Sequence, residues 1–290
     1  MRAQTQFLDI EYFDDGPRDG LVVLLQHGWP DDASTWAKVS PVLNAAGLRT
    51  IAPFLRGFGG TSFRDASAPR TGSPGILAHD AVDLMDALGI DMFFVAGHDW
   101  GSNVAEALAV GWRKRVTRIA MLSTPPRLGG LNTPSFAQSQ RYWYHWFQAT
   151  KRGEEAIRKD PKGFARVMWD NWSPPGWYDE ATFEAVARSW DNPDWVDVML
   201  HSYRVRWDEA APDPRAVELE ATIRATTQLA TPTLYIFGGA DGVNPPEFSK
   251  NVPAKFSGPF EALMLDGVGH FPTREAPDKV ATALVRHFGK

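Results

Sequence analysis

An aspartate occupies a position where the chain would expose a reactive side chain. The stretch AGHDWGSNV (96–104) follows an apolar run and places Asp99 between Gly97 and Gly101. Such spacing at a strand-to-helix turn is typical of a nucleophile elbow, whose reactive residue is usually serine. Aspartate at a turn of this kind is more commonly a helix N-cap, but the flanking glycines and the partner residues described below favour a nucleophile.

A carboxylate and a serine hydroxyl are suited to different reactions. Serine needs an adjacent base to remove its proton before it attacks a carbonyl carbon. The side chain of Asp99, with an ordinary pKa of about 4, is ionised already, and a carboxylate is a weak nucleophile toward carbonyls. It suits displacement at a saturated carbon that carries a leaving group, which leaves an alkyl ester on the aspartate. The residue type therefore favours epoxides or organohalides as substrates.

Apolar runs typical of buried parallel strands recur along the chain and alternate with helix-like stretches. An alternation of strand and helix predicts a parallel sheet with right-handed crossovers. Strands are expected at 21–29, 50–55, 92–100, 118–126, 231–242 and 260–270, after an exposed strand at 7–15, and helices at 40–47, 78–89, 102–112 and 276–288.

The alternation stops in the middle of the chain. From about 127 to 217 the pattern is helical and no buried-strand run occurs, while eight of the 12 tryptophans lie between positions 143 and 207. We therefore predict an α/β core domain formed by 1–126 and 218–290, with a helical cap domain at 127–217 inserted into it.

Four informative residues fall after the expected strands, where ligands bind in open parallel sheets. They are Trp29, Asp99, Asp241 and His270. The order nucleophile, acid, histidine is that of the α/β-hydrolase triad. On this interpretation His270 activates water to hydrolyse the ester on Asp99, and Asp241 holds the imidazole. Asp266 is the nearest rival acid, but it is expected in or beside the last strand.

Four motifs in the same order resemble the α/β-hydrolase superfamily, in the branch of epoxide hydrolases and dehalogenases that use an aspartate. The resemblance covers the whole chain and implies a mostly parallel central sheet flanked by helices, with an inserted helical cap. It also implies that the backbone N–H groups of Trp29 and Trp100 form an oxyanion hole. The motifs are HGWP (27–30), LRGFGGTS (55–62), GHDWGS (97–102) and GVGHFPTREAPDKV (267–280).

Epoxides and organohalides differ in the leaving group, and we expect residues of the cap to stabilise that group. An opening epoxide needs an acid, and a tyrosine hydroxyl suits that task. Tyr203, which is followed by arginine, resembles the second cap tyrosine of epoxide hydrolases. The tyrosine that would act with Tyr203 is not determined by the sequence. Tyr144 and Tyr142 both lie near the position that epoxide hydrolases use, but aligning WFQ (146–148) with the epoxide-hydrolase pattern places Trp143 at that position. Each of these aromatic residues could equally serve only to pack the cap on the core.

A second resemblance points to dehalogenases. The sequence YHW (144–146) is similar to the halide-pocket segment of fluoroacetate dehalogenases, which implies a pocket of His145, Trp146 and Tyr203. Those enzymes hold the substrate carboxylate with arginines directly after the nucleophile and three residues later.

This chain has Trp100 and Asn103 at those two positions, and neither replaces a guanidinium. A haloacid substrate is therefore disfavoured. Haloalkane dehalogenases share the DWGS sequence, although many place asparagine where this chain has Trp29. We predict opening of an epoxide to a vicinal diol, with haloalkane or haloacid dehalogenation as the alternative. Hydrolysis of another electrophile such as a strained lactone, and a ligand-binding protein with low turnover, are further alternatives.

Composition excludes several other classes. The 290 residues are sufficient for one large core, and the net charge of −5 argues against nucleic acid as a partner. The absence of cysteine excludes disulfides and thiolate ligands, and the histidines lack metal-ligand spacing, so no metal or cofactor is expected. No apolar run reaches the length of a membrane span. We expect a cytoplasmic monomer or homodimer that acts on a small apolar substrate and water.

Overall fold

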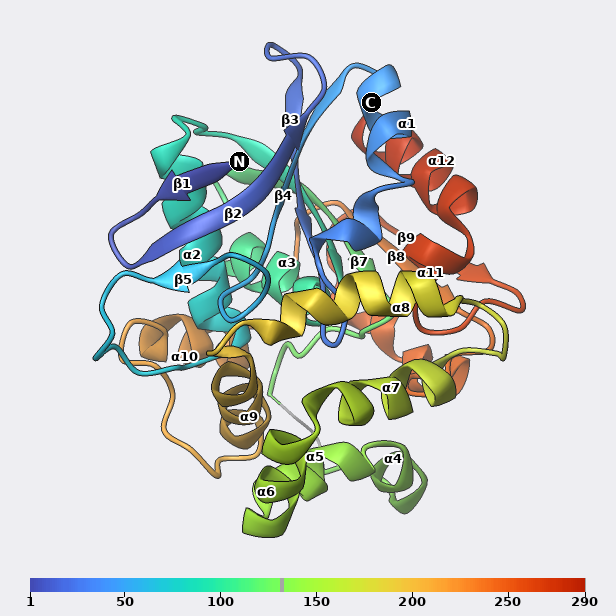
Figure 1. The fold of residues 1–290 in the computed structure, drawn as a ribbon. Helices are drawn as coiled ribbons and strands as arrows, with labels where there is room; N and C mark the ends of the chain where they lie inside the picture. Colours follow the sequence, from blue (N-terminus) through green and yellow to red (C-terminus); the bar gives the residue numbers. More distant parts are fainter. Residues whose placement is uncertain (131–132, 290) are drawn as a thin grey trace.

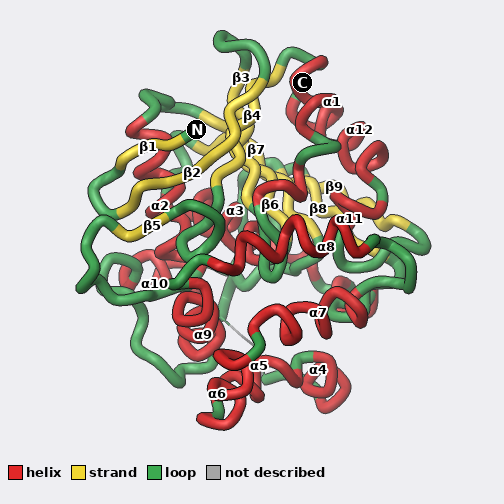
Figure 2. The backbone as a smooth tube through the Cα atoms, in the orientation of Figure 1, coloured by secondary structure: helices red, strands yellow, loops and turns green. Residues whose placement is uncertain are grey.

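The computed structural model describes residues 1–130 and 133–289, and its centre is a nine-stranded sheet (Figures 1 and 2). The sheet is mostly parallel, as the sequence predicts, and the alpha/beta hydrolase arrangement is confirmed. The strands are β1 (Arg2–Gln4), β2 (Leu8–Asp15), β3 (Leu21–Gln26), β4 (Leu48–Pro53), β5 (Ser62–Phe63), β6 (Phe93–His98), β7 (Val116–Leu122), β8 (Thr233–Gly238) and β9 (Phe260–Leu265).

The strand order places the ends of the central strands next to one another. It runs β1-β2-β4-β3-β6-β7-β8-β9, with β5 paired to β2. From β4 to β9 the pairs are parallel, whereas β2 is antiparallel to β1, β4 and β5. In register, Gln26 of β3 lies opposite Gly97 of β6, which lies opposite Met121 of β7. The loops that follow these three strands therefore leave the sheet at one level.

Helices cover both faces of the sheet. One face packs against α1 and α12, and the other against α2 and α3, on which α10 packs in turn (Figure 1). Alternating side chains of each buried strand serve the two faces, as with Leu24 and Leu25 of β3, which belong to opposite core clusters. These helices are α1 (Ser40–Ala45), α2 (Pro74–Ala87), α3 (Trp100–Gly111), α10 (Val217–Ala225), α11 (Pro272–Glu275) and α12 (Pro277–Phe288), with short 3-10 turns η1 (Ala33–Trp36), η3 (Pro246–Ser249) and η4 (Val252–Lys255).

A group of helices between β7 and β8 lies over the end of the sheet where the central loops emerge (Figures 1 and 2). We call α4–α9 the cap helices; the domain boundaries at 126/127 and 217/218 stay a prediction. Fully buried Trp169 and Trp195 belong to the same core cluster as Trp29 of the loop after β3. The cap helices are α4 (Phe136–Arg141), α5 (Trp143–Ala149), α6 (Lys151–Lys159), α7 (Pro161–Trp172), α8 (Glu180–Ala187) and α9 (Trp195–Arg206), with η2 (Arg188–Asp191).

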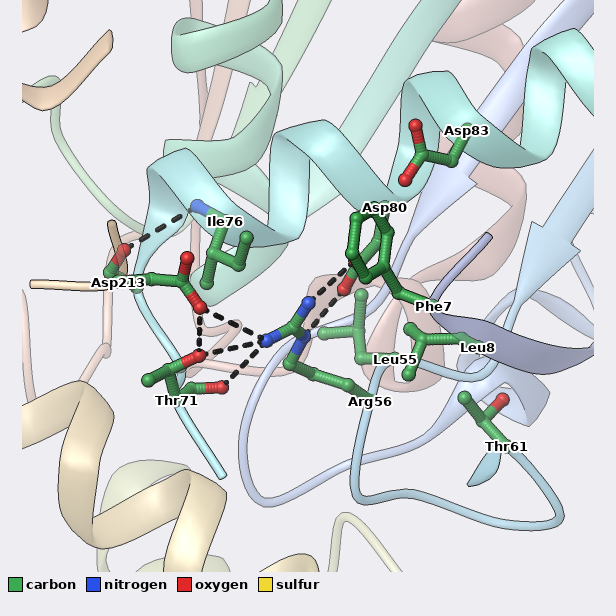
Figure 3. Close-up of polar contacts among 12 residues, drawn as sticks. Phe7, Leu8, Leu55, Arg56, Thr61, Thr71, Ile76, Asp80, Asp83 and Asp213 are labelled. Atoms are coloured by element: carbon green, nitrogen blue, oxygen red, sulfur yellow. Dashed lines mark hydrogen bonds and ion pairs between the residues drawn. The ribbon is translucent and has the colours of Figure 1, made fainter. Parts of the chain in front are cut away.

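A buried arginine joins the core to the segment that returns from the cap (Figure 3). Both oxygens of Asp80 in α2 accept hydrogen bonds from Arg56, at 2.6 Å each. A third guanidinium nitrogen donates to the carbonyl and hydroxyl oxygens of Thr71. That hydroxyl also bonds Asp213, which precedes α10. The loop after β4, the segment leading into α2 and the segment before α10 therefore meet at one guanidinium.

Two expectations about element boundaries need correction. Helix α2 begins at Pro74, before the expected position 78, because Ser73 caps it by accepting from the backbone N–H of Ile76. The strands also end earlier than the apolar runs, since residues such as Trp29 are buried by the cap helices and not by strand pairing. Within the described residues, no helix is both long and apolar enough to cross a membrane.

Candidate active site

Asp99 occupies a sharp turn between β6 and α3. Its backbone has φ 52°, in the left-handed region that non-glycine residues rarely adopt. The turn packs directly on the neighbouring strand: a Cβ atom on Gly101 would come within 2.2 Å of the carbonyl oxygen of Gln26. Strain of this kind is tolerated where the surroundings impose it and is concentrated at functional sites. The fold therefore holds Asp99, which is 8% exposed, at the end of the sheet below the cap helices.

Backbone N–H groups surround the Asp99 carboxylate. Trp29 donates its backbone N–H to Oδ1 at 2.9 Å, and the backbone N–H of Trp100 also bonds this carboxylate. Burial works against ionisation, but the hydrogen bond and charge of His270, the charge of His98 and the backbone N–H of Trp100 keep the pKa of Asp99 below its usual value. The carboxylate is therefore ionised at neutral pH, and both N–H groups predicted for an oxyanion hole face it.

His270 lies between two carboxylates. Its Nδ1 is 2.8 Å from Oδ2 of Asp241, and its Nε2 is 3.4 Å from Oδ2 of Asp99. Burial alone would lower the pKa of His270, but the charges of Asp241 and Asp99 raise it to about 10. The second oxygen of Asp241 accepts from the backbone N–H groups of Val243 and Asn244, at 2.7 and 2.8 Å. In the free protein the imidazole is therefore a cation held by two anions.

The structure thus brings together the three residues of the predicted triad, and Asp266 lies exposed in the turn after β9. Sequence reasoning missed two neighbours of these residues. Thr124, two residues after the end of β7, donates its hydroxyl to Oδ2 of Asp99 at 3.4 Å. His98 donates from Nε2 to the carbonyl oxygen of His270 at 2.7 Å. The position of Thr124 after a central strand was a usable signal, but nothing in the sequence pointed to the contact of His98.

Two cap tyrosines lie above the nucleophile. The hydroxyl of Tyr203 accepts a hydrogen bond from Nε1 of Trp100 at 3.3 Å, and Tyr144 hydrogen-bonds the same tyrosine. Their rings flank the indole of Trp29, at centroid distances of 5.9 Å for Tyr144 and 5.5 Å for Tyr203. Burial, reinforced by the charge of Asp99, raises the pKa of both tyrosines well above the usual value. Both hydroxyls are therefore protonated and able to donate.

The other cap residues predicted to bind substrate are placed differently. The hydroxyl of Tyr142 donates a hydrogen bond to Oδ1 of Asn244 at 2.7 Å, in the loop that carries Asp241. Its proton is therefore not directed at a substrate above Asp99. His145 packs against Tyr203 with ring centroids 4.7 Å apart. Its Nδ1 accepts from Nε1 of Trp207 at 3.1 Å, and burial lowers its pKa well below the usual value, so the ring is neutral with its proton on Nε2.

Trp143 and Trp146 lie at the surface of the cap. Their exposed fractions are 40% and 36%, and Nε1 of Trp146 donates to the carbonyl oxygen of Ser139. Of the three residues expected to form a halide pocket, the structure therefore brings His145 and Tyr203 together and directs the indole N–H of Trp146 elsewhere.

The end of cap helix α7 contacts the loops that carry the acid and the histidine. The carbonyl oxygen of Trp172 accepts from the backbone N–H of His270 at 3.1 Å and from that of Gly242 at 3.0 Å. The hydroxyl of Ser173 accepts from the same N–H of His270 at 2.8 Å and donates to Glu275 at 2.6 Å. This contact, which the sequence did not suggest, makes part of the cap a support for His270.

No resident metal site is evident in the part of the chain that the structure describes: it contains no group of three or more His, Asp or Glu side chains that could hold an ion. The chemistry available is that of an ionised carboxylate, a hydrogen-bonded imidazolium, two backbone N–H donors and two protonated phenols.

Comparisons with known proteins identify the family. The profile of the family described as alpha/beta hydrolase fold matches residues 22–276. A solved structure of a proposed epoxide hydrolase from Klebsiella pneumoniae is 36% identical, with TM-score 0.92, over 99% of this chain and 96% of that one. Epoxide hydrolase A of Mycobacterium tuberculosis is 28% identical over 91% of this chain and 89% of its own length.

A fluoroacetate dehalogenase from Burkholderia is also 28% identical, over 64% of this chain and 62% of its own length. The relatives thus include both kinds of enzyme that the sequence motifs resemble. The chain belongs to the alpha/beta hydrolase fold family and is an enzyme of the branch that contains epoxide hydrolases and a dehalogenase.

Proposed function

We propose that this protein hydrolyses epoxides to vicinal diols through an alkyl ester on Asp99. The observation that carries the proposal is the pair of protonated hydroxyls of Tyr144 and Tyr203 above an ionised aspartate. An alkoxide leaving group must gain a proton, whereas a halide needs only hydrogen-bond donors. Two phenols with raised pKa values are suited to the first task.

In the first step Oδ2 of Asp99 attacks an oxirane carbon, while Oδ1 stays bonded to the N–H of Trp29. The carbon–oxygen bond of the ring breaks, and the oxygen takes a proton from Tyr203 or Tyr144. The product is a hydroxyalkyl ester on Asp99 and a tyrosinate. Because the ester is uncharged, His270 loses one of the two anions that hold its proton.

In the second step His270 acts as the base. Its proton restores the tyrosine, and the neutral Nε2 takes a proton from water as the water oxygen attacks Cγ of Asp99. The resulting oxyanion lies at the N–H groups of Trp29 and Trp100. The bond between Cγ and the alkyl oxygen then breaks, and the diol oxygen takes the proton from His270. The carboxylic acid left on Asp99 gives its proton to His270, which restores both the carboxylate and the imidazolium. The negative charge of Asp99 thus keeps His270 protonated, and His270 becomes available as a base only after the ester has formed.

Dehalogenation is the second candidate, and one observation favours it. The indole N–H of Trp100 points into the site, toward Tyr203, and an N–H donor there suits a departing halide. Haloacids are disfavoured because Trp100 and Asn103, not arginines, follow Asp99.

Product analysis separates the two candidates. The protein is incubated with an aryl epoxide and with a bromoalkane, and diol and bromide are assayed; we expect diol. Bromide release without diol would overturn the proposal and favour the dehalogenase.

Trapping the intermediate tests the nucleophile. A His270→Gln variant should accumulate an adduct on Asp99 that peptide mass spectrometry detects. His287→Gln, which changes a histidine of α12 that hydrogen-bonds the carbonyl oxygen of Ile119, is the matched control and should show none. If the His270 variant forms no adduct with an epoxide that the wild type consumes, Asp99 is not the nucleophile.

A further inference from the structure

The two carboxylate oxygens of Asp99 have different surroundings. Oδ1 accepts the backbone N–H of Trp29 at 2.9 Å. Oδ2 faces two side chains, because Nε2 of His270 and the hydroxyl oxygen of Thr124 each lie 3.4 Å from it. All four residues are buried. The oxygen that would carry the alkyl group of the ester is therefore the one that Thr124 contacts.

The backbone that carries Thr124 is strained. Ser123, the first residue after β7, has φ 63°. The backbone N–H of Thr124 donates across it to the carbonyl oxygen of Leu122 at 2.8 Å. A bond between residues i and i+2 around a positive φ belongs to the rare, strained form of the γ-turn. Such strain persists only where the surroundings impose it, and it is concentrated at functional sites.

This strained turn lies beside the turn of the nucleophile. Asp99 and Ser123 are two of the three non-glycine residues with positive φ in the described chain. They follow neighbouring strands, since His98 at the end of β6 lies opposite Leu122 at the end of β7. The backbone N–H of Asp99 also donates to the carbonyl oxygen of Leu122 at 3.1 Å. Two adjacent strained turns thus bring a carboxylate and the hydroxyl of Thr124 together.

Further bonds hold the turn of Thr124 in place. The hydroxyl of Ser102 in α3 donates to the carbonyl oxygen of Thr124 at 2.8 Å. The side-chain amide of Asn244 donates to the carbonyl oxygen of Ser123 at 3.0 Å. Thr124 also precedes Pro125, which restricts its backbone to extended conformations. The fold therefore fixes the place of this hydroxyl before any substrate binds.

We propose that Thr124 is a catalytic residue of ester hydrolysis, in which its hydroxyl donates a hydrogen bond to the departing oxygen. The inference rests on the proposed function, in which Oδ2 of Asp99 becomes the alkyl oxygen of the ester. After water has attacked Cγ, the bond between Cγ and Oδ2 breaks and its electron pair stays on Oδ2. Oδ2 then takes the proton that His270 received from the water.

A hydroxyl donor stabilises the negative charge that develops on Oδ2 as this bond breaks. The distance of 3.4 Å between the hydroxyl of Thr124 and Oδ2 is long for a hydrogen bond between two oxygens. Catalytic hydrogen bonds are often long in the free enzyme and shorten in the reacting complex. The contact is therefore placed to strengthen when the charge appears.

The same hydrogen bond has opposite effects on the two steps. In the first step Oδ2 is the attacking atom, and a donor bonded to it makes it less reactive. In the second step Oδ2 is the departing atom, and the donor makes its departure easier. Loss of the hydroxyl should therefore slow hydrolysis of the ester without slowing its formation. A threonine that only packed against Asp99 would affect both steps alike.

Rapid-quench mass spectrometry with an aryl epoxide and excess enzyme measures formation and decay of the ester on Asp99. Thr124→Val keeps the shape of the side chain; ester decay should slow by roughly 10- to 100-fold, and ester formation should be as fast as in the wild type or faster. Thr124→Ala should show the same pattern without the added methyl group. Thr124→Ser, which keeps the hydroxyl, should restore most of the decay rate.

Thr233→Val is the matched control. Thr233 is buried at the start of β8, at the end of the strand remote from the site, and its hydroxyl donates to the carbonyl oxygen of Thr231 at 2.8 Å. This variant should keep both wild-type rates.

The same measurement with a bromoalkane separates this inference from the proposed function, because its ester on Asp99 is hydrolysed in the same second step. If bromide is released, no epoxide is opened and Thr124→Val accumulates the ester, the role of Thr124 stands and the proposed function fails. If epoxides are opened but Thr124→Val slows both steps equally, or Thr124→Ser is as slow as Thr124→Val, the proposed function stands and the inference is wrong. Consumption of both substrates by the wild type without any ester on Asp99 would overturn both.

Discussion

Replacing Asp99 by asparagine should lower the pKa of His270. The imidazole lies 2.8 Å from Asp241 and 3.4 Å from Asp99, and these two carboxylates raise its pKa to about 10 against the effect of burial. Asparagine keeps the shape of the side chain and removes one of the two charges. The variant therefore reproduces, without substrate, the charge state that esterification would create.

The expected change follows from the distances. An opposite charge within about 4–6 Å shifts a pKa by roughly 1–3 units. Asp241 is closer and remains in place, so the pKa of His270 should fall to between about 7 and 9. Imidazole in the unfolded chain titrates near 6.5, so the raised pKa of His270 contributes its full stability below pH 6.5, and that contribution is lost as the pH rises toward 10. Asp99→Asn should move the upper end of this loss to lower pH.

Nuclear magnetic resonance of ¹⁵N-labelled histidine measures the titration directly. The chain has seven histidines, and the His270→Gln variant assigns the signal. Asp266→Asn, which removes an exposed carboxylate outside the site, is the control and should leave the titration of His270 at the wild-type position. Two results would refute the conclusion that the charge of Asp99 keeps His270 protonated: a wild-type His270 that is neutral at pH 7, or a titration of His270 that does not change in Asp99→Asn.

Three further substitutions have expected outcomes. Ser173→Ala removes an acceptor of the His270 N–H, so it should slow hydrolysis of the ester more than its formation; rapid-quench mass spectrometry should show ester accumulating, and equal slowing of both steps would count against a positioning role. Tyr203→Phe should reduce diol formation by roughly 100-fold or more with little effect on any bromide release, and equal losses in the two assays would contradict its role as the acid. Arg56→Met leaves Asp80 buried without its partner, so urea unfolding should show a loss of about 3–5 kcal/mol; a loss below about 1 kcal/mol would show that the network in Figure 3 adds little stability.

The sequence was sufficient to predict the sheet and the grouping of Asp99, Asp241 and His270. Buried parallel strands have a strong local pattern, and their carboxyl ends must meet at one edge of the sheet. Residues that directly follow such strands are therefore brought together by topology, without any knowledge of side-chain packing. Thr124 follows the same rule and was predictable on the same grounds.

The cap could not be predicted to the same detail, for a physical reason. Helix α4 ends at Arg141 and α5 begins at Trp143, with Tyr142 between them. This break resets the helical phase, so the spacing of aromatic residues in YWYHW does not determine which of them faces Asp99. The structure buries Tyr144 against Tyr203 and Trp29 and exposes Trp143.

Long-range contacts were likewise outside the reach of sequence patterns. The bonding of His270 to Ser173 joins two segments that no periodicity relates.

The carbonyl oxygen of Trp172, shared between the loops of the acid and the histidine, has a consequence for protein engineering. If cap segments are exchanged between relatives, these two hydrogen bonds constrain the crossover points. A chimaera that replaces residues 136–159 leaves both hydrogen bonds of Trp172 intact and should inherit a working histidine. One that also replaces 161–173 must provide a carbonyl oxygen at the same place. Among the described residues, the backbone N–H of His270 has no backbone acceptor other than Trp172.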